Sequence, residues 1–152
     1  MIISTILSRE TIVPDSKINI IWTDTNNSFK EFIQSLGHNL IDFNELYYGY
    51  NVPQLILCNN KTEYYNECYN LSIKLHLPIV IVDHEVKNKF LDINKIHDLN
   101  FPCYHHVCLS ENIKQSWGAI DAQVISYDIN NTESKKIWQN LIFQAAKKLY
   151  LR

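Results

Sequence analysis

Short apolar runs alternate with amphipathic segments along most of this chain. Four runs have the composition of β-strands, at residues 17–23, 54–58, 78–83 and 105–109. The run 78–83 is the richest in β-branched residues, and neither it nor the run 54–58 shows polar alternation. Such continuous apolar runs are typical of strands buried on both faces of a parallel sheet. Two further strands are predicted at 38–43 and 123–127.

Helical patterns separate these strands. Residues 28–36 place apolar side chains at i, i+3, i+4 and i+7, with Ser28 and Glu31 as a capping box and Gly37 as the stop. Similar patterns predict helices at 62–75 and 87–98, and a brief helix capped by Ser110.

A terminal helix over residues 133–151 is predicted to begin at Asn130 with Glu133. Its core face is expected to carry Ile137, Leu141, Ala145 and Leu149. Its lysines are expected to face water: Lys135, Lys136, Lys147 and Lys148.

Strands that alternate with helices indicate right-handed crossovers and a parallel sheet. The predicted fold class is therefore α/β: a three-layer, Rossmann-like, mostly parallel doubly wound sheet, with the strands 54–58 and 78–83 at its centre. We expect a single domain over residues 17–152, preceded by an arm or an added edge strand in residues 1–16.

Charge and composition exclude several function classes. The net charge is −2, and no Lys/Arg cluster is longer than a doublet, which disfavours a nucleic-acid partner or a membrane surface. No apolar run reaches the length of a membrane span, and the first seven residues lack the basic start of a signal peptide. A cytoplasmic location is expected, with the four cysteines as reduced core thiols.

Asn and Ile are abundant and Gly, with three residues, is scarce. This bias indicates an AT-rich genome, such as that of a phage or a low-GC bacterium. A phage origin would make association with the virion an alternative to the cytoplasmic location.

In a doubly wound sheet, ligands bind at the carboxyl ends of the strands. The loop after the first strand offers hydroxyls and amides for an anion before a helix, through Thr23, Thr25, Asn27 and Ser28. It loosely resembles the phosphate loop of flavodoxins, so an FMN binder is one alternative. The loop has no glycine, however, and a polar turn that caps a helix is the favoured interpretation. No cofactor is expected.

Two histidine motifs stand near strand ends. His84-Glu85 follows the most apolar strand and should lie in the crevice, where the imidazole can act as an acid or base or bind a sugar hydroxyl. His105-His106, with Cys103 and Cys108, suggests a metal site, but strand alternation divides these residues between two faces, and their spacing is not that of zinc ligands. No metal is expected. The tyrosines of residues 47–50 could stack on a sugar or a protein, or cover the sheet edge.

Four segments, in order, resemble the N-terminal half of GT-B glycosyltransferases of the family 4 type. Residues 53–60 (Pro-Gln-Leu-Ile-Leu-Cys-Asn-Asn) and 77–85 (Leu-Pro-Ile-Val-Ile-Val-Asp-His-Glu) resemble two strands of that half, the second ending in a histidine. Residues 106–117 resemble its Val-Ser-Glu-x-x-Lys-x-x-Trp segment, and 124–129 stand where that family has Val-Ile-Pro-Asn-Gly-Ile-Asp. Ser126 and Asp128 replace the Pro and Gly of that last motif.

The resemblance implies an acceptor-side half without the donor-binding domain, because the family's Glu-x7-Glu signature has no match here. Such a chain would be part of a split or degenerate glycosyltransferase, and its partners would be a sugar acceptor and a second domain or chain. The residues implied in the acceptor cleft are Asn59, Asn60, His84, Glu85, Ser110 and Glu111. A non-enzymatic interaction or structural module of a larger assembly is the alternative.

The missing donor signature leads to a test. Calorimetry of the isolated chain with UDP-, GDP- and ADP-sugars should show no binding tighter than about 1 mM, or roughly −4 kcal/mol. A micromolar affinity for any of them would contradict the interpretation of the chain as a half without a donor site.

Overall fold

The computed structural model describes residues 17–24, 26–42, 52–60, 64–88 and 105–147. These residues form strands and helices that alternate for most of the chain. The strands are β1 (Asn19–Trp22), β2 (Asn39–Asp42), β3 (Leu55–Cys58), β4 (Ile79–Asp83), β5 (His105–Cys108) and β6 (Gln123–Val124). The helices are α2 (Asn27–Ser35), α3 (Tyr65–Leu75), α4 (Glu111–Trp117) and α5 (Thr132–Ala146).

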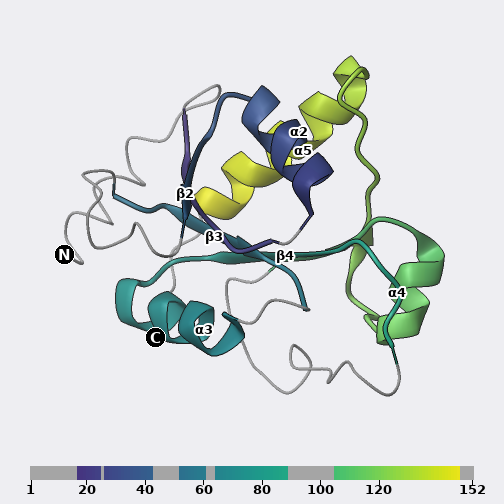
Figure 1. The fold of residues 1–152 in the computed structure, drawn as a ribbon, viewed down its shortest axis with the longest axis horizontal. Coiled ribbons are helices and arrows are strands. Elements are labelled where there is room, and N and C mark those ends of the chain that lie inside the picture. The colour runs from purple at the N-terminus through teal and green to yellow at the C-terminus, as the bar shows by residue number, and fades with distance from the viewer. Residues whose placement is uncertain (1–16, 25, 43–51, 61–63, 89–104, 148–152) are drawn as a thin grey trace.

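All six strands belong to one parallel sheet in the order β2-β1-β3-β4-β5-β6 (Figure 1). The chain runs outward from β1 to β2, returns to β3 on the other side of β1, and then proceeds in one direction. The topological switch point therefore lies between β1 and β3, as in other doubly wound sheets of order 2-1-3-4-5. The predicted α/β Rossmann-like class is confirmed, as is the central position of β3 and β4.

Helices cover both faces of the sheet. Figure 1 shows α2 and α5 on one side and α3 and α4 on the other. Alternate residues of each strand supply the two cores: Leu57 and Val82 pack with α2 and α5, whereas Ile56 and Ile81 pack with α3. A smaller cluster joins Cys108 to Trp117 of α4. Because both faces are covered, β3 and β4 are buried along their whole length.

Two predicted helix starts are wrong. The N-cap of α2 is Asn26, not Ser28, and the Asn26 side chain accepts a hydrogen bond from the Phe29 amide at 2.9 Å. The N-cap of α5 is Asn131, whose side chain accepts from the Ser134 amide at 3.0 Å, and Asn130 lies in the preceding turn, where its amide donates to Asp128 Oδ1. The predicted stop at Gly37 is confirmed by its φ of +92°.

The last strand is shorter than expected. Residues 123–127 were predicted, but β6 ends at Val124, and the Ser126 carbonyl accepts a hydrogen bond from the Trp138 indole instead of extending the ladder. The predicted helix 87–98 falls almost wholly outside the described residues, as do the tyrosines of 47–50 and the arm 1–16. Among the described helices, none is long and apolar enough to cross a membrane.

Helix α5 docks on the sheet through a stripe that differs from the predicted one. Leu141 and Ala145 are buried as expected, but Ile137 is 45% exposed. The core positions are instead Trp138 and Ile142, both fully buried. The inward face therefore includes Trp138 and Ile142 beside Leu141 and Ala145, and its centre lies between the predicted row and the next one on the helix. Lys136 and Lys147 are exposed as predicted, Lys135 is half-buried, and residues 148 and 149 lie outside the described part.

Leu141→Ala should lower the free energy of unfolding by about 2–5 kcal/mol, since it removes a buried side chain from the main core. Denaturant melts would measure the change. Gln144→Ala is the matched control: the residue is exposed on the same helix, so the change should stay within about 0.5 kcal/mol. Equal, small effects of both substitutions would mean that α5 is not docked as described.

Candidate functional site

Polar side chains gather where β1, β3 and β4 end. The pair Thr23-Asp24 follows β1, and the pair Asn59-Asn60 follows β3. Asp83 is the last residue of β4, and His84 follows it, so all three pairs lie at the carboxyl edge of the sheet. Successive residues of an extended chain point to opposite faces. The edge therefore carries two separate networks, one on the side of α2 and α5 and one on the side of α3 and α4.

The first network joins Asp24, Asn59 and His84. His84 Nε2 lies 2.8 Å from Asp24 Oδ2, and the two side chains are 5% and 0% exposed. Asp24 Oδ1 accepts hydrogen bonds from the Asn26 amide at 2.8 Å and from Asn59 Nδ2 at 3.4 Å. The carboxyl group is thus held by three donors from three different loops and cannot easily reorient.

Aromatic rings enclose His84 on the side of α2. The imidazole lies 4.9 Å from the Phe29 ring and 6.3 Å from the Tyr127 ring, centroid to centroid. Burial, together with the nearby Asp24, raises the pKa of the Tyr127 phenol above its ordinary value, so this ring stays neutral. Its hydroxyl donates to Asn26 Oδ1 at 3.4 Å, which links the segment after β6 to the cap of α2.

The partner of Nε2 determines the tautomer of His84. In a neutral imidazole, a carboxylate at Nε2 favours the tautomer that carries the proton on Nε2, and Nδ1 is then an acceptor. Nδ1 is buried and has no hydrogen-bond partner among the described residues. An orphaned buried acceptor costs about 1–3 kcal/mol. A ligand O–H or N–H group would satisfy it, and a carboxylate-backed imidazole can also take up the proton of such a group.

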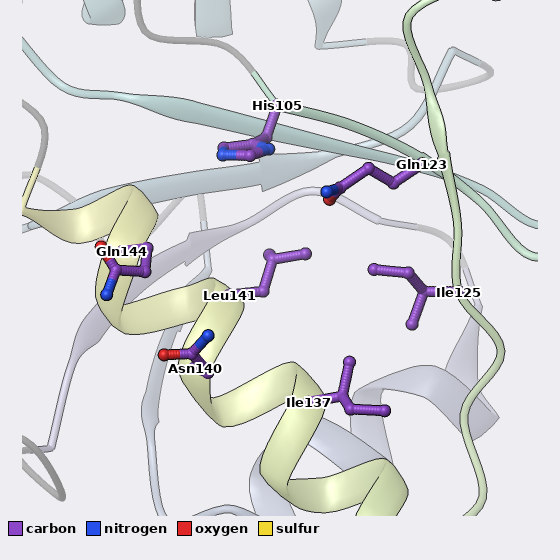
Figure 2. A pocket seen from close by; sticks show the side chains of 7 residues that line it. All are labelled: His105, Gln123, Ile125, Ile137, Asn140, Leu141 and Gln144. Carbon is purple, nitrogen blue, oxygen red and sulfur yellow. The ribbon is translucent and has the colours of Figure 1, made fainter.

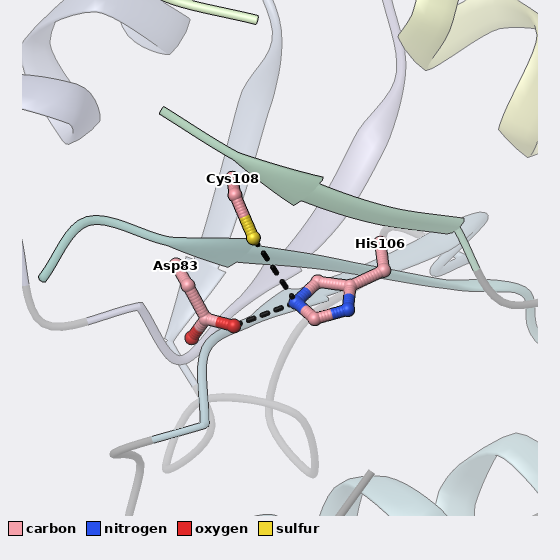
Figure 3. A group of neighbouring side chains, drawn as sticks. All are labelled: Asp83, His106 and Cys108. Carbon is pink, nitrogen blue, oxygen red and sulfur yellow. Dashed lines mark hydrogen bonds and ion pairs between the residues drawn. The ribbon is translucent and has the colours of Figure 1, made fainter. Parts of the chain in front are cut away.

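The second network joins Asn60, Asp83, His106 and Cys108. His106 Nε2 lies 2.6 Å from Asp83 Oδ2 and 3.7 Å from Cys108 Sγ (Figure 3). Asn60 holds the carboxylate from the other side, through its amide to Oδ1 at 3.1 Å and its Nδ2 to Oδ2 at 2.7 Å. All four residues are buried.

This second group is not a Cys-His-Asp nucleophile. In such triads the carboxylate holds one ring nitrogen and the thiol faces the other, whereas here Asp83 and Cys108 both contact His106 Nε2. Burial, followed by the charge of Asp83, raises the pKa of the Cys108 thiol to about 12. The sulfur is therefore a neutral thiol near pH 7 and not an activated nucleophile.

The structure divides the six predicted cleft residues. Asn59 and His84 meet in the first network, and Asn60 lies in the second. Glu85 has an exposed side chain, and its backbone carbonyl accepts from the Trp117 indole.

The remaining two predicted residues belong to helix α4. The Ser110 side chain caps the helix by accepting from the Ile113 amide, as its position predicted. Glu111 is exposed in the first turn.

The geometry argues against an anion in the loop after β1. The Thr23 hydroxyl donates to the Leu57 carbonyl at 3.3 Å and points toward α3. The Phe29 amide donates to Asn26 Oδ1 and the Asn26 amide donates to Asp24 Oδ1, and the buried Asp24 carboxylate would repel a phosphate. Asn27 and Ser28 are exposed, and Thr25 lies outside the described residues.

Sequence reasoning missed four members of the two networks: Asp24, Asp83, His106 and Cys108. The position of the two aspartates in the sequence could have identified them. Asp83 ends β4 and Asp24 lies just after β1, at the edge of the sheet where ligands bind in this class of fold. His106 was judged only with its neighbours in sequence. Its partner Asp83 comes from the adjacent strand, a pairing that depends on sheet register.

A groove of about 200 Å³ lies elsewhere, between α5 and the strands β5 and β6 (Figure 2). It is lined largely by Ile125, Ile137 and Leu141, with His105 at its border. None of the predicted cleft residues lines this groove.

The high pKa of Cys108 predicts slow alkylation. At pH 8, iodoacetamide should modify Cys108 in the folded chain at least about 100-fold more slowly than in urea, because both thiolate formation and access are suppressed. Peptide mass mapping over time would measure the rate. Comparable rates in the folded and unfolded chain would contradict the buried, neutral thiol.

The chain was compared with protein families, curated proteins and solved structures. No family, no curated protein and no solved structure matches it. The interpretation of the site therefore comes from its own geometry and from the sequence resemblance described above.

Proposed function

We propose that this chain is a sugar-binding, acceptor-side domain of a split or degenerate glycosyltransferase, which does not transfer sugar unaided. Its ligand is a polyhydroxylated acceptor, and the reaction requires a second, donor-binding domain or chain. The residues that bind the acceptor are those of the first network, with His84 as the central group.

The buried Asp24–His84 pair carries the proposal. It stands at the carboxyl ends of β1 and β4, beside the switch point where doubly wound sheets bind ligands. Its imidazole has one nitrogen held by a carboxylate and the other without a partner among the described residues. A sugar hydroxyl that donates to Nδ1 would complete the hydrogen bonds of this ring.

The surroundings of His84 suit such a ligand. Small-molecule sites combine aromatic walls with a few fixed polar groups, and here the rings of Phe29 and Tyr127 flank the imidazole. Tyr127 is half-buried, so one part of the wall reaches the surface. Apolar faces of sugar rings pack on such aromatic side chains, while hydroxyls meet the polar groups.

The sequence resemblance supports the finer assignment. The segment 77–85 that resembles the family's histidine-ending strand is β4 together with His84. The resemblance implies that this histidine contacts the acceptor or the transferred sugar. The resemblance and the geometry of the site therefore favour His84 independently of each other.

An interaction module is the second candidate, favoured by apolar side chains on the surface. Ile120 is 86% exposed, and Val124 of the edge strand β6 is 43% exposed. Single exposed apolar residues are ordinary in globular proteins, so this observation is weaker than the buried dyad.

The test is binding of unmodified sugars to the full chain. Saturation-transfer NMR with glucose, galactose, mannose and N-acetylglucosamine should show transfer to at least one of them. His84→Gln should weaken that sugar's binding by about tenfold, the equivalent of one lost hydrogen bond of about 1.4 kcal/mol. His105→Gln, at the opposite end of the sheet, is the matched control and should leave binding unchanged.

Two results would overturn the proposal. One is the absence of transfer to every sugar by a wild-type chain that melts cooperatively. The other is equal sugar binding by His84→Gln and His105→Gln, which would place the ligand elsewhere and favour the interaction module.

A further inference from the structure

We propose that Asp83, His106 and Cys108 form a binding site for a divalent transition-metal ion of the zinc class. The site lies on the α3 and α4 side of the sheet, opposite the Asp24–His84 pair, and does not depend on the proposed sugar binding. It departs from the expectation that the chain holds no metal, which considered only ligands close together in sequence.

The first argument is convergence. The carboxylate oxygen, the imidazole nitrogen and the sulfur all lie within 4.8 Å of one another, and Figure 3 shows the three side chains directed to a common point. Tetrahedral bonds of about 2.0–2.3 Å place pairs of zinc ligand atoms about 3.3–3.6 Å apart. The Nε2–Sγ distance of 3.7 Å is already close to this value. The Nε2–Oδ2 distance of 2.6 Å must open by less than about 1 Å.

The second argument is the scaffold. In the register of the sheet, Asp83 is paired with Cys108, and His106 with Ile81. His106 and Cys108 are two residues apart on β5, so their side chains share one face. All three ligands therefore come from two adjacent parallel strands inside the sheet, which hold them more rigidly than loops would.

The third argument is charge. A buried carboxylate is tolerated when it is paired or coordinates a metal. A dication bound by one carboxylate, one thiolate and a neutral imidazole gives a group of zero net charge, which suits a site where each ligand is at most 4% exposed. On binding, the Cys108 thiol gives its proton to solvent, and the sulfur becomes a thiolate ligand.

The fourth argument is an independent polar atom beside the ligands. Asn60 donates its Nδ2 to Asp83 Oδ2, and its Oδ1, on the same carboxamide, is buried without a hydrogen-bond partner among the described residues. Three protein ligands leave a fourth position open on zinc, where water binds. A water bound there would be a donor for Asn60 Oδ1. Asn60 would thus orient both the carboxylate and the water, as outer residues of metal sites do.

The ligand set also selects the metal. Sulfur and imidazole ligands favour zinc, cobalt and related ions, whereas magnesium and calcium require oxygen ligands. Cobalt(II) can therefore report on the site, because a cobalt–thiolate bond produces a charge-transfer absorption and a tetrahedral site produces visible bands.

The experiment is titration of the purified, metal-free full chain with cobalt(II) and zinc(II). We expect one cobalt ion per chain with a thiolate charge-transfer band, and displacement of that cobalt by zinc. Cys108→Ser should abolish the band and weaken zinc binding at least about 100-fold. Cys68→Ser is the matched control, because Cys68 is another buried thiol on the α3 side of the sheet but is not one of the three proposed ligands. This variant should keep both the charge-transfer band and the zinc affinity of the wild type.

Folding of the variants is checked by their circular dichroism, and a second measurement needs no variant. X-ray absorption of the wild-type zinc complex should show one sulfur at about 2.3 Å and otherwise nitrogen or oxygen ligands. The proposal is overturned if excess cobalt produces no charge-transfer band in the wild type. It is equally overturned if the band survives in Cys108→Ser, or if zinc has two or more sulfur ligands.

Discussion

The central strands of this protein are covered on both faces, and this constraint determines how every polar group at their ends must behave. Because α2 and α5 lie on one side and α3 and α4 on the other, no side chain of β3 or β4 reaches bulk water along the strand. Polar residues therefore lie at the ends of these strands, with Gln54 before β3 and the two networks at the carboxyl edge. Even there Asp24 and Asp83 are buried, and each must find donors within the protein.

The strand ends meet this requirement with a small set of residues. Asn59 and Asn60 are consecutive, as are Asp83 and His84, and the alternation of an extended chain sends one of each pair to each face. Each face thus receives one carboxylate, one carboxamide and one imidazole, with a thiol added on the side of α4. Two networks of similar composition result.

The networks differ in their surroundings, and this difference separates their chemistry. Aromatic rings flank His84 and reach toward the surface through Tyr127, an arrangement suited to a hydroxylated organic ligand. Around Cys108 the packing is with Trp117 and two alanines, and the polar atoms of three side chains face each other at short distances. That arrangement suits a small ion. Each network also contains a buried acceptor without a donor among the described residues, His84 Nδ1 and Asn60 Oδ1.

The sequence by itself determined the class of fold, because the unbroken apolar runs of β3 and β4 are typical of strands covered on both faces and they alternate with helical patterns. It also indicated the edge where polar residues gather, and with it Asn59, Asn60 and His84. The sequence could not show whether Asn26 or Ser28 caps α2, because both residue types are good N-caps. The backbone conformation and the hydrogen bond to the Phe29 amide decide for Asn26.

Only the tertiary structure decided which polar residues meet. The partners Asp24 and His84 are 60 residues apart, and Asp83 and His106 are 23 apart. Their contacts depend on the strand order, which places β4 between β3 and β5, and on the register of the strands. A shift of one residue in that register would move each side chain of a strand to the other face of the sheet. Hydrophobic periodicity and cap residues show where a residue lies within its own helix or strand. Ligand sites built across parallel strands depend on relations between elements, which no local pattern contains.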